Sequence, residues 1–188
     1  MRGDIVGLVV LVVVLALITL YLSQTASRLD RLHHRIDTSR AILQGQFQDR
    51  ANQVLALATS GRIDPASTVL LADAADAALI ESRISGEQFD PARCAAESAL
   101  TRSLEVALSD DGVLQEIKEQ PGGPQTLADL GAAAQKAAWS RRFHNDAVRA
   151  CLALRKQRLV RLFRLAGSAP LPRTVELDDE VPAAFRSR

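Results

Sequence analysis

The chain has 188 residues and a formal net charge of +1, and 47% of its residues are hydrophobic but only 4% are aromatic. A nearly neutral charge excludes a strongly basic nucleic-acid-binding protein and a chain dominated by an acidic tail. Leu, Ala and Arg are abundant, while Val and Ile are sparse after residue 22. This composition favours helix over strand.

The first predicted element is a membrane-spanning helix. Residues 5–22 (IVGLVVLVVVLALITLYL) carry no charge, and a helix of that length covers about 27 Å, close to the hydrocarbon thickness of a bilayer. The run exceeds the apolar region of about 7–15 residues in a cleaved signal peptide, and no clean A-x-A site follows it. We therefore predict an anchor at residues 1–26, with a cleaved signal or a buried core helix as the alternatives.

The orientation of this anchor follows from the basic residues on its two sides. Arg2 precedes the apolar run, whereas Arg28, Arg31, Arg35 and Arg40 follow it within a short stretch. Because Lys and Arg stay on the cytoplasmic side, we expect a single-pass protein of the cell membrane. Its N-terminus lies outside and the bulk of the chain lies in the cytoplasm.

The next predicted element is a long helix over residues 27–60, continuous with the anchor. Its apolar residues recur at steps of three, four and seven, and Gly61 ends it. Asp64-Pro65 and Asp90-Pro91 each read as an N-cap followed by Pro at the first helical position. They predict helices to about residues 84 and 108. In the first of these we expect Asp73 and Asp76 to face water and a buried face made of Val69, Leu70, Ala74, Ala77, Leu79 and Ile80.

A short helix over residues 113–119 and a long final helix complete the predicted elements. Pro121-Gly122-Gly123-Pro124 separates the two. The final helix starts with Thr126 as its cap, extends to Leu165 and ends at Gly167. The predicted fold is therefore all-α, with an N-terminal transmembrane helix followed by an antiparallel bundle of long helices at residues 27–167. Residues 168–188 contain three prolines and an acidic cluster, and we expect an extended or disordered tail.

No set of residues in the sequence predicts catalysis, a metal site or a cofactor. His33 and His34 are adjacent and point to different helix faces, so they cannot form an i, i+4 metal pair. His144 and Asp146 are two apart and do not face each other on a helix. All three histidines are expected on solvated helix surfaces. Cys94 and Cys151 are expected to be buried thiols in a reducing cytoplasm, although a disulfide would be open to them outside it.

The stretch RACLALRKQRLVRLFR at residues 149–164 is basic, amphipathic and free of acidic residues. Such a helix can pack in the bundle with solvated arginines, lie on an anionic membrane surface or bind a partner. Nucleic acid is not expected, because no aromatic platform accompanies the arginines. The candidate membrane or partner surface consists of Arg149, Arg155, Lys156, Arg158, Arg161 and Arg164.

The segment WSRRFHNDAVR at residues 139–149 resembles the signature helix of LemA family proteins, which typically reads A-R-R-x-Y-N-D-A-V-R. The matching residues are Arg141, Arg142, Phe143, Asn145, Asp146, Val148 and Arg149. GQFQDR at residues 45–50 and ESALTRSL at residues 97–104 are similar to two further family segments. The family's Pro and Asn after Arg50 are missing, and its usual C-terminal segment is replaced. The resemblance implies a bacterial, membrane-anchored antiparallel or coiled-coil helical bundle without established catalytic residues.

These observations predict an interaction or scaffold protein without enzymatic activity or cofactors. The alternative is a regulatory or stress-related accessory protein that acts on the lipid surface through its basic helix. The expected partners are the lipid bilayer and a protein of unspecified identity, which includes a second copy of this chain.

Overall fold

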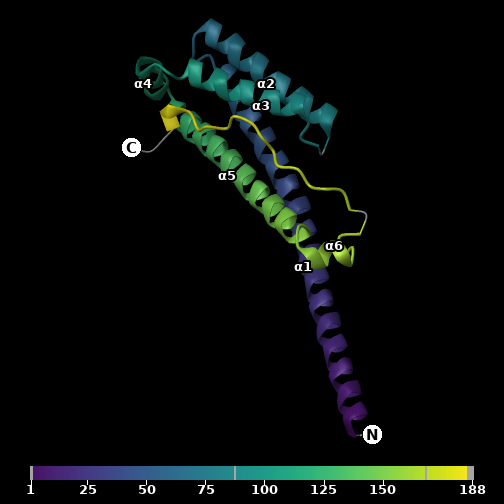
Figure 1. The fold of residues 1–188 in the computed structure, drawn as a ribbon. Coiled ribbons are helices and arrows are strands. Elements are labelled where there is room, and N and C mark those ends of the chain that lie inside the picture. The colour runs from purple at the N-terminus through teal and green to yellow at the C-terminus, as the bar shows by residue number, and fades with distance from the viewer. Residues whose placement is uncertain (1, 87, 168, 186–188) are drawn as a thin grey trace. The chain divides into compact units, whose positions relative to one another are not determined.

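The computed structural model describes residues 2–86, 88–167 and 169–185 and confirms an all-α fold (Figure 1). Among the described residues there is no strand. One helix, α1, is long and apolar enough to cross a membrane by its length and composition. The helices are α1 (Arg2–Ala58), α2 (Pro65–Ser85), α3 (Pro91–Ala107), α4 (Asp111–Glu119), α5 (Gly123–Arg155), α6 (Arg158–Leu162) and the 3₁₀ helix η1 (Ala183–Phe185).

The chain divides into two compact units. The first contains Met1–Asp37 and Asp146–Thr174, and the second contains Thr38–Asn145 and Val175–Arg188. Helices α1 and α5 each contribute residues to both units. The predicted boundary at residue 26 lies inside α1, which continues through it without a break.

The two Asp-Pro signals begin helices α2 and α3 as predicted. The Asp64 carboxylate accepts hydrogen bonds from the backbone N–H groups of Ala66 and Ser67, and Asp90 accepts one from Arg93. Each Pro occupies the first turn, where no intrahelical N–H bond is lost. The hydrogen bond from Arg93 also lowers the pKa of Asp90.

Small side chains form the buried face of α2, which packs against α3. The prediction chose the wrong face of α2 as the buried one. Val69 is 69% exposed, and Leu70, Ala77 and Ile80 are exposed as well. Because alanines lie on several faces of this helix, its apolar pattern does not single out one of them. Of the predicted set Ala74 is buried and Leu79 is partly buried, and Asp73 and Asp76 are exposed as expected. The buried residues are Leu71, Ala74, Ala75, Ala78 and Ser82.

The breaks around α5 differ from the predicted ones. The helix begins at Gly123, inside the PGGP turn, and Gly123 approaches the Ile117 carbonyl so closely that the carbonyl oxygen leaves no room for a Cβ atom. Thr126 is therefore not the cap. At the other end α5 stops at Arg155, and Gln157 is extended with ψ 138° before α6 begins. The prediction of one helix to Leu165 was wrong, because the turn at Gln157 lets Val160 join a buried cluster.

A buried ion pair joins α1 to α3 in the second unit. Arg50 Nη2 lies 2.6 Å from Glu97 Oε2, and both side chains are only 2% exposed. Arg50 also donates to the Glu97 carbonyl and to the Thr101 hydroxyl. Burial raises the pKa of Glu97, and Arg50 and Arg93 oppose that rise. The pair is well bonded, but either charge alone would be costly to bury.

Glu97→Ala is expected to destabilise the protein by about 3–5 kcal/mol, because it leaves the Arg50 guanidinium buried without its counter-charge. Urea denaturation of the full chain in detergent, followed by circular dichroism, measures the change. The double variant Arg50→Met/Glu97→Leu removes both charges and is expected to recover most of that loss. A single variant as stable as the wild type would show that the pair does not matter for the fold.

Candidate membrane-interface site and the C-terminal segment

The first unit is held together by a small apolar core between α1, α5 and α6. Leu29 and Ile36 on α1 meet Val148 and Cys151 on α5, and Val160 from α6 joins them. The spacing of 29 and 36 is one heptad, which keeps both residues on the same side of α1. The core therefore places α6 beside the helix that carries the uncharged stretch.

Helix α6 and the residue that follows it turn three large apolar side chains away from this core. Leu159, Leu162 and Phe163 are all exposed, with Leu162 72% exposed. They line a groove of about 390 Å³ whose other residues are Leu17, Ile18, Tyr21 and Leu22 of α1. The groove contains no charged residue. The end of the uncharged stretch and α6 thus form one continuous apolar surface.

The six basic residues of the predicted surface fall into two groups. Arg155 donates to the carbonyls of Ala169 and Pro170, and Arg149 is paired with Asp146 at 2.7 Å. These two arginines are engaged within the unit. The other four are exposed and follow the break at the end of α5: Lys156, Arg158, Arg161 and Arg164. The stretch therefore packs as a bundle helix in its first half and presents a surface in its second.

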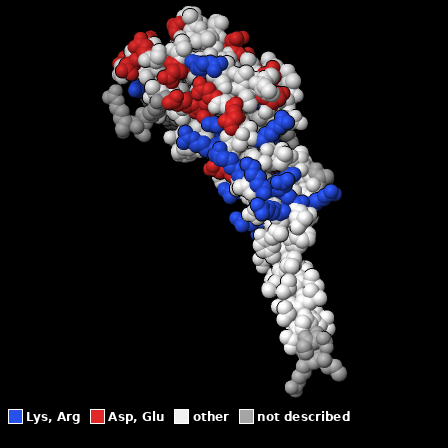
Figure 2. All heavy atoms as spheres, viewed as in Figure 1, with Lys and Arg blue, Asp and Glu red and all other residues white. Residues whose placement is uncertain are grey.

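The first unit is strongly basic although the whole chain is nearly neutral. Residues 5–37 and 146–174 contain ten Lys and Arg and three acidic residues, a net charge of +7. Figure 2 shows the basic side chains gathered immediately beyond the uncharged stretch of α1. A second groove, of about 520 Å³, lies among them. It is lined by Arg28, Arg31, Leu32 and Arg35 of α1, by Ala150, Ala153 and Leu154 of α5, and by Gln157.

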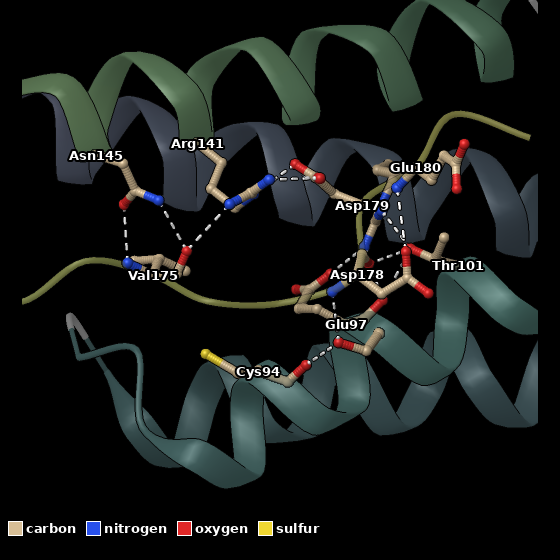
Figure 3. A network of polar contacts seen from close by, with 11 residues as sticks. Cys94, Glu97, Thr101, Arg141, Asn145, Val175, Asp178, Asp179 and Glu180 are labelled. Atoms are coloured by element: carbon tan, nitrogen blue, oxygen red, sulfur yellow. Dashed lines mark hydrogen bonds and ion pairs between the residues drawn. The ribbon is translucent and has the colours of Figure 1, made fainter.

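In the second unit, the LemA-like segment of α5 binds the C-terminal segment of the chain (Figure 3). The Asn145 side chain accepts a hydrogen bond from the Val175 N–H at 2.8 Å and donates one to the Val175 carbonyl at 3.0 Å. Arg141 makes two bonds to the Asp179 carboxylate, at 2.6 and 2.7 Å. This bond to Asp179 raises the pKa of Arg141. Arg141 and Asn145 are four residues apart and therefore share a face of α5.

Helix α3 holds the same segment from the other side. The Ser98 hydroxyl accepts from the Asp178 N–H, and the Thr101 hydroxyl donates to the Asp178 carbonyl. Val175 enters a buried cluster with Leu43 and Phe47 of α1 and Ala137 of α5. Of the two states predicted for this tail, extended or disordered, the extended one describes residues 169–182. Residues 168 and 186–188 of the predicted tail lie outside the described residues.

The remaining residues of the LemA-like segment have separate roles. Val148 is fully buried in the core of the first unit, whereas Arg142 and Phe143 are exposed. His144 is only 2% exposed, and its Nδ1 lies 2.9 Å from the Ser39 hydroxyl. The prediction of a solvated His144 was therefore wrong. The sequence offers no signal for this, because the partner of His144 lies on a helix more than a hundred residues away.

The other predicted candidates keep simple roles. His34 is exposed as expected, with Nε2 3.8 Å from Asp30 Oδ2. Cys94 and Cys151 are free thiols, and burial raises the pKa of both. Cys151 is buried as predicted and Cys94 is partly buried.

Comparison with known proteins finds no matching family model, curated protein or solved structure. The resemblance to the LemA family therefore stays a prediction.

Asn145→Ala is expected to release the segment around Val175, because it leaves the buried Val175 N–H without its partner and the Val175 carbonyl with only the 3.3 Å bond from Arg141. An unpaired buried group costs about 1–3 kcal/mol. Amide hydrogen exchange at Val175 should accelerate by at least about tenfold, since about 1.4 kcal/mol corresponds to a factor of ten. Arg142→Ala on the same helix is the control and should leave the exchange rate unchanged. Equal exchange in both variants would show that Asn145 does not hold the segment.

Proposed function

We propose that this chain is a single-pass membrane protein whose helical bundle serves as an interaction or scaffold module at the cytoplasmic face of the cell membrane. Helix α6 and the neighbouring basic residues lie in the lipid headgroup region. The observation that carries the proposal is the net charge of +7 on the unit that also contains the uncharged stretch of α1. The function is one of binding, without catalysis.

The exposure of the uncharged stretch supports the membrane assignment. Its large apolar side chains are exposed between 44% and 62% from Ile5 to Tyr21. A soluble protein rarely leaves so large an apolar surface open. A bilayer can cover this surface without leaving backbone N–H or C=O groups unpaired, because a helix satisfies its own backbone hydrogen bonds.

The place of α6 along α1 supports its assignment to the lipid interface. Its groove partners run from Leu17 to Leu22, the last part of the uncharged stretch. These five helical steps span about 7.5 Å. Interfacial helices bury their apolar face about 5–10 Å into the boundary between headgroups and chains. Tyr21 stands where aromatic residues gather in membrane proteins.

The cytoplasmic assignment rests on the arginines that follow the stretch. Arg28, Arg31 and Arg35 lie within 15 residues of Leu22, which is the range over which basic residues set orientation. An anionic inner leaflet would add about 1 kcal/mol for each basic residue near it. The same charges thus favour one sidedness and hold α6 to the surface.

A protein-binding role for the bundle is supported by the aromatic residues that α5 exposes. Trp139, 59% exposed, and Phe143 are four residues apart on one face, with Arg142 beside them. Trp and Arg are enriched among the residues that dominate binding energy at interfaces. The partner would be another protein or a second copy of this chain. Membership of the LemA family would fit an anchored bundle of this kind.

Sidedness can be measured with a single introduced thiol. Ser109→Cys lies in the exposed turn after α3, and Cys94→Ala and Cys151→Ala remove the natural thiols. We expect a membrane-impermeant maleimide to label this variant only after the cells are permeabilised. A thiol introduced before residue 5 is the control and should react in intact cells. Labelling of the Ser109 position in intact cells would reverse the proposed orientation.

The depth of α6 can be measured by spin labelling in the same cysteine-free background. A label at Leu162→Cys in nanodiscs with anionic lipid should be relaxed by oxygen and shielded from a water-soluble nickel chelate. In neutral nanodiscs the shielding should weaken, because the attraction of the basic residues is lost. A label at Ser109→Cys should stay open to the chelate in both. Full access at Leu162 in anionic nanodiscs would contradict a lipid-facing α6.

A further inference from the structure

The two grooves of the first unit lie along one face of α1. Leu17 and Tyr21 line the apolar groove, and Arg28, Arg31 and Arg35 line the basic one. Their spacings are four, seven, three and four residues, which repeat on a single helix face. An elongated molecule lying along this face would contact both grooves, with an apolar end toward residue 17 and a polar end toward residue 35.

The apolar groove has the chemistry of a slot for an acyl chain. All seven of its residues are apolar or aromatic, and α6 with the following Phe163 supplies three of them as a second wall. On a plain transmembrane helix a lipid chain meets one convex surface. Here a chain is flanked by α1 and by Leu159, Leu162 and Phe163, so more of its area leaves the bulk lipid.

The basic groove has the chemistry of a headgroup site. Ala150 and Ala153 leave its α5 wall open, Leu32 and Leu154 form its floor, and the arginines and Gln157 supply donors. Two of the nearby carboxylates have partners elsewhere: Asp30 lies near His34, and Asp146 accepts from Arg149. Asp37 has a partner as well. Guanidinium groups bind phosphate through paired hydrogen bonds.

The distance along α1 between the apolar groove and the basic groove matches the distance between the chain and the headgroup of a lipid in the bilayer. Arg28 lies seven residues beyond Tyr21, about 10 Å along the helix. The headgroup layer of one leaflet is roughly 5–7 Å thick. Helical side chains tilt toward the N-terminus, which points the arginines back toward the lipid. Arg28 and Arg31 can therefore reach a lipid phosphate while the chain of that lipid lies against Leu17 and Phe163.

We propose that the face of α1 shared by the two grooves is a binding site for one anionic phospholipid, with an acyl chain between α1 and α6 and the headgroup phosphate on Arg28 and Arg31. This inference rests on the proposed membrane function and goes beyond it. General attraction to an anionic leaflet needs only charge, whereas this site selects one molecule and retains it.

The test is lipid retention by the full chain. The protein is reconstituted in nanodiscs of phosphatidylcholine with phosphatidylglycerol, released into mild detergent and weighed by native mass spectrometry. We expect one retained phosphatidylglycerol per chain. Arg28→Gln/Arg31→Gln should reduce the retained fraction by at least about tenfold. The matched control Arg83→Gln/Arg102→Gln removes the same charge from exposed positions of the second unit, outside both grooves, and should retain the lipid.

Two further arms separate the alternatives. Glycerol phosphate, which carries the anion without a chain, should not displace the lipid, and Phe163→Ser should weaken retention. Equal loss in the two arginine double variants, or no retained lipid, would overturn the site. If the site is overturned in this way but the Leu162 label is still shielded from the chelate in anionic nanodiscs, the proposed membrane function is retained and only the lipid site is rejected. Displacement by glycerol phosphate, or binding of an acidic peptide in place of lipid, would also overturn it.

Discussion

The exposed apolar surface of residues 5–22 is the constraint on which the first unit depends. This surface is uncharged and exposed from residue 5 to residue 21, and only its end, from Leu17 to Leu22, is flanked by α6. The other features of the first unit are grouped at the end of this surface. Tyr21 and Leu22 contact α6, and the arginines begin six residues after Leu22. The charge changes sharply along α1: residues 5–27 carry none, and Arg28, Arg31 and Arg35 then follow within about two turns.

The turn at Gln157 decides what the basic stretch of residues 149–164 can do. A continuous helix would have kept Leu159, Leu162 and Phe163 in line with α5. Instead Val160 packs against the core of α1 and α5, and Arg155 bonds to the carbonyls of residues 169 and 170. Three apolar side chains are then left facing outward beside the uncharged stretch. The first half of this stretch therefore packs in the bundle, and the second half exposes the basic and apolar side chains that the proposed lipid surface requires.

Local signals in the sequence predicted much of this fold, and long-range contacts account for most of what they missed. Asp64-Pro65 and Asp90-Pro91 begin helices because an Asp cap and a first-turn Pro act within four residues. The uncharged run and the long helix after it are equally local. The burial of His144 depends on Ser39, and the order of the tail depends on Asn145 and Thr101. In both cases the partner residues lie far away in the sequence from the residues whose structure they determine. The prediction of the buried face of α2 failed for another reason: alanines lie on several faces of this helix, so its apolar pattern does not single out one of them.

The buried polar groups of the second unit explain why the LemA-like segment carries polar residues on a packed helix. A helix that only filled a core would place apolar residues at 141 and 145. Arg141 and Asn145 instead bind backbone and carboxylate groups of the C-terminal segment, and Arg50 does the same for Glu97 on α3. Such bonds add little net stability but penalise any arrangement that leaves one partner buried alone. They therefore select one position for a segment that, from residue 169 to residue 182, has no regular secondary structure of its own.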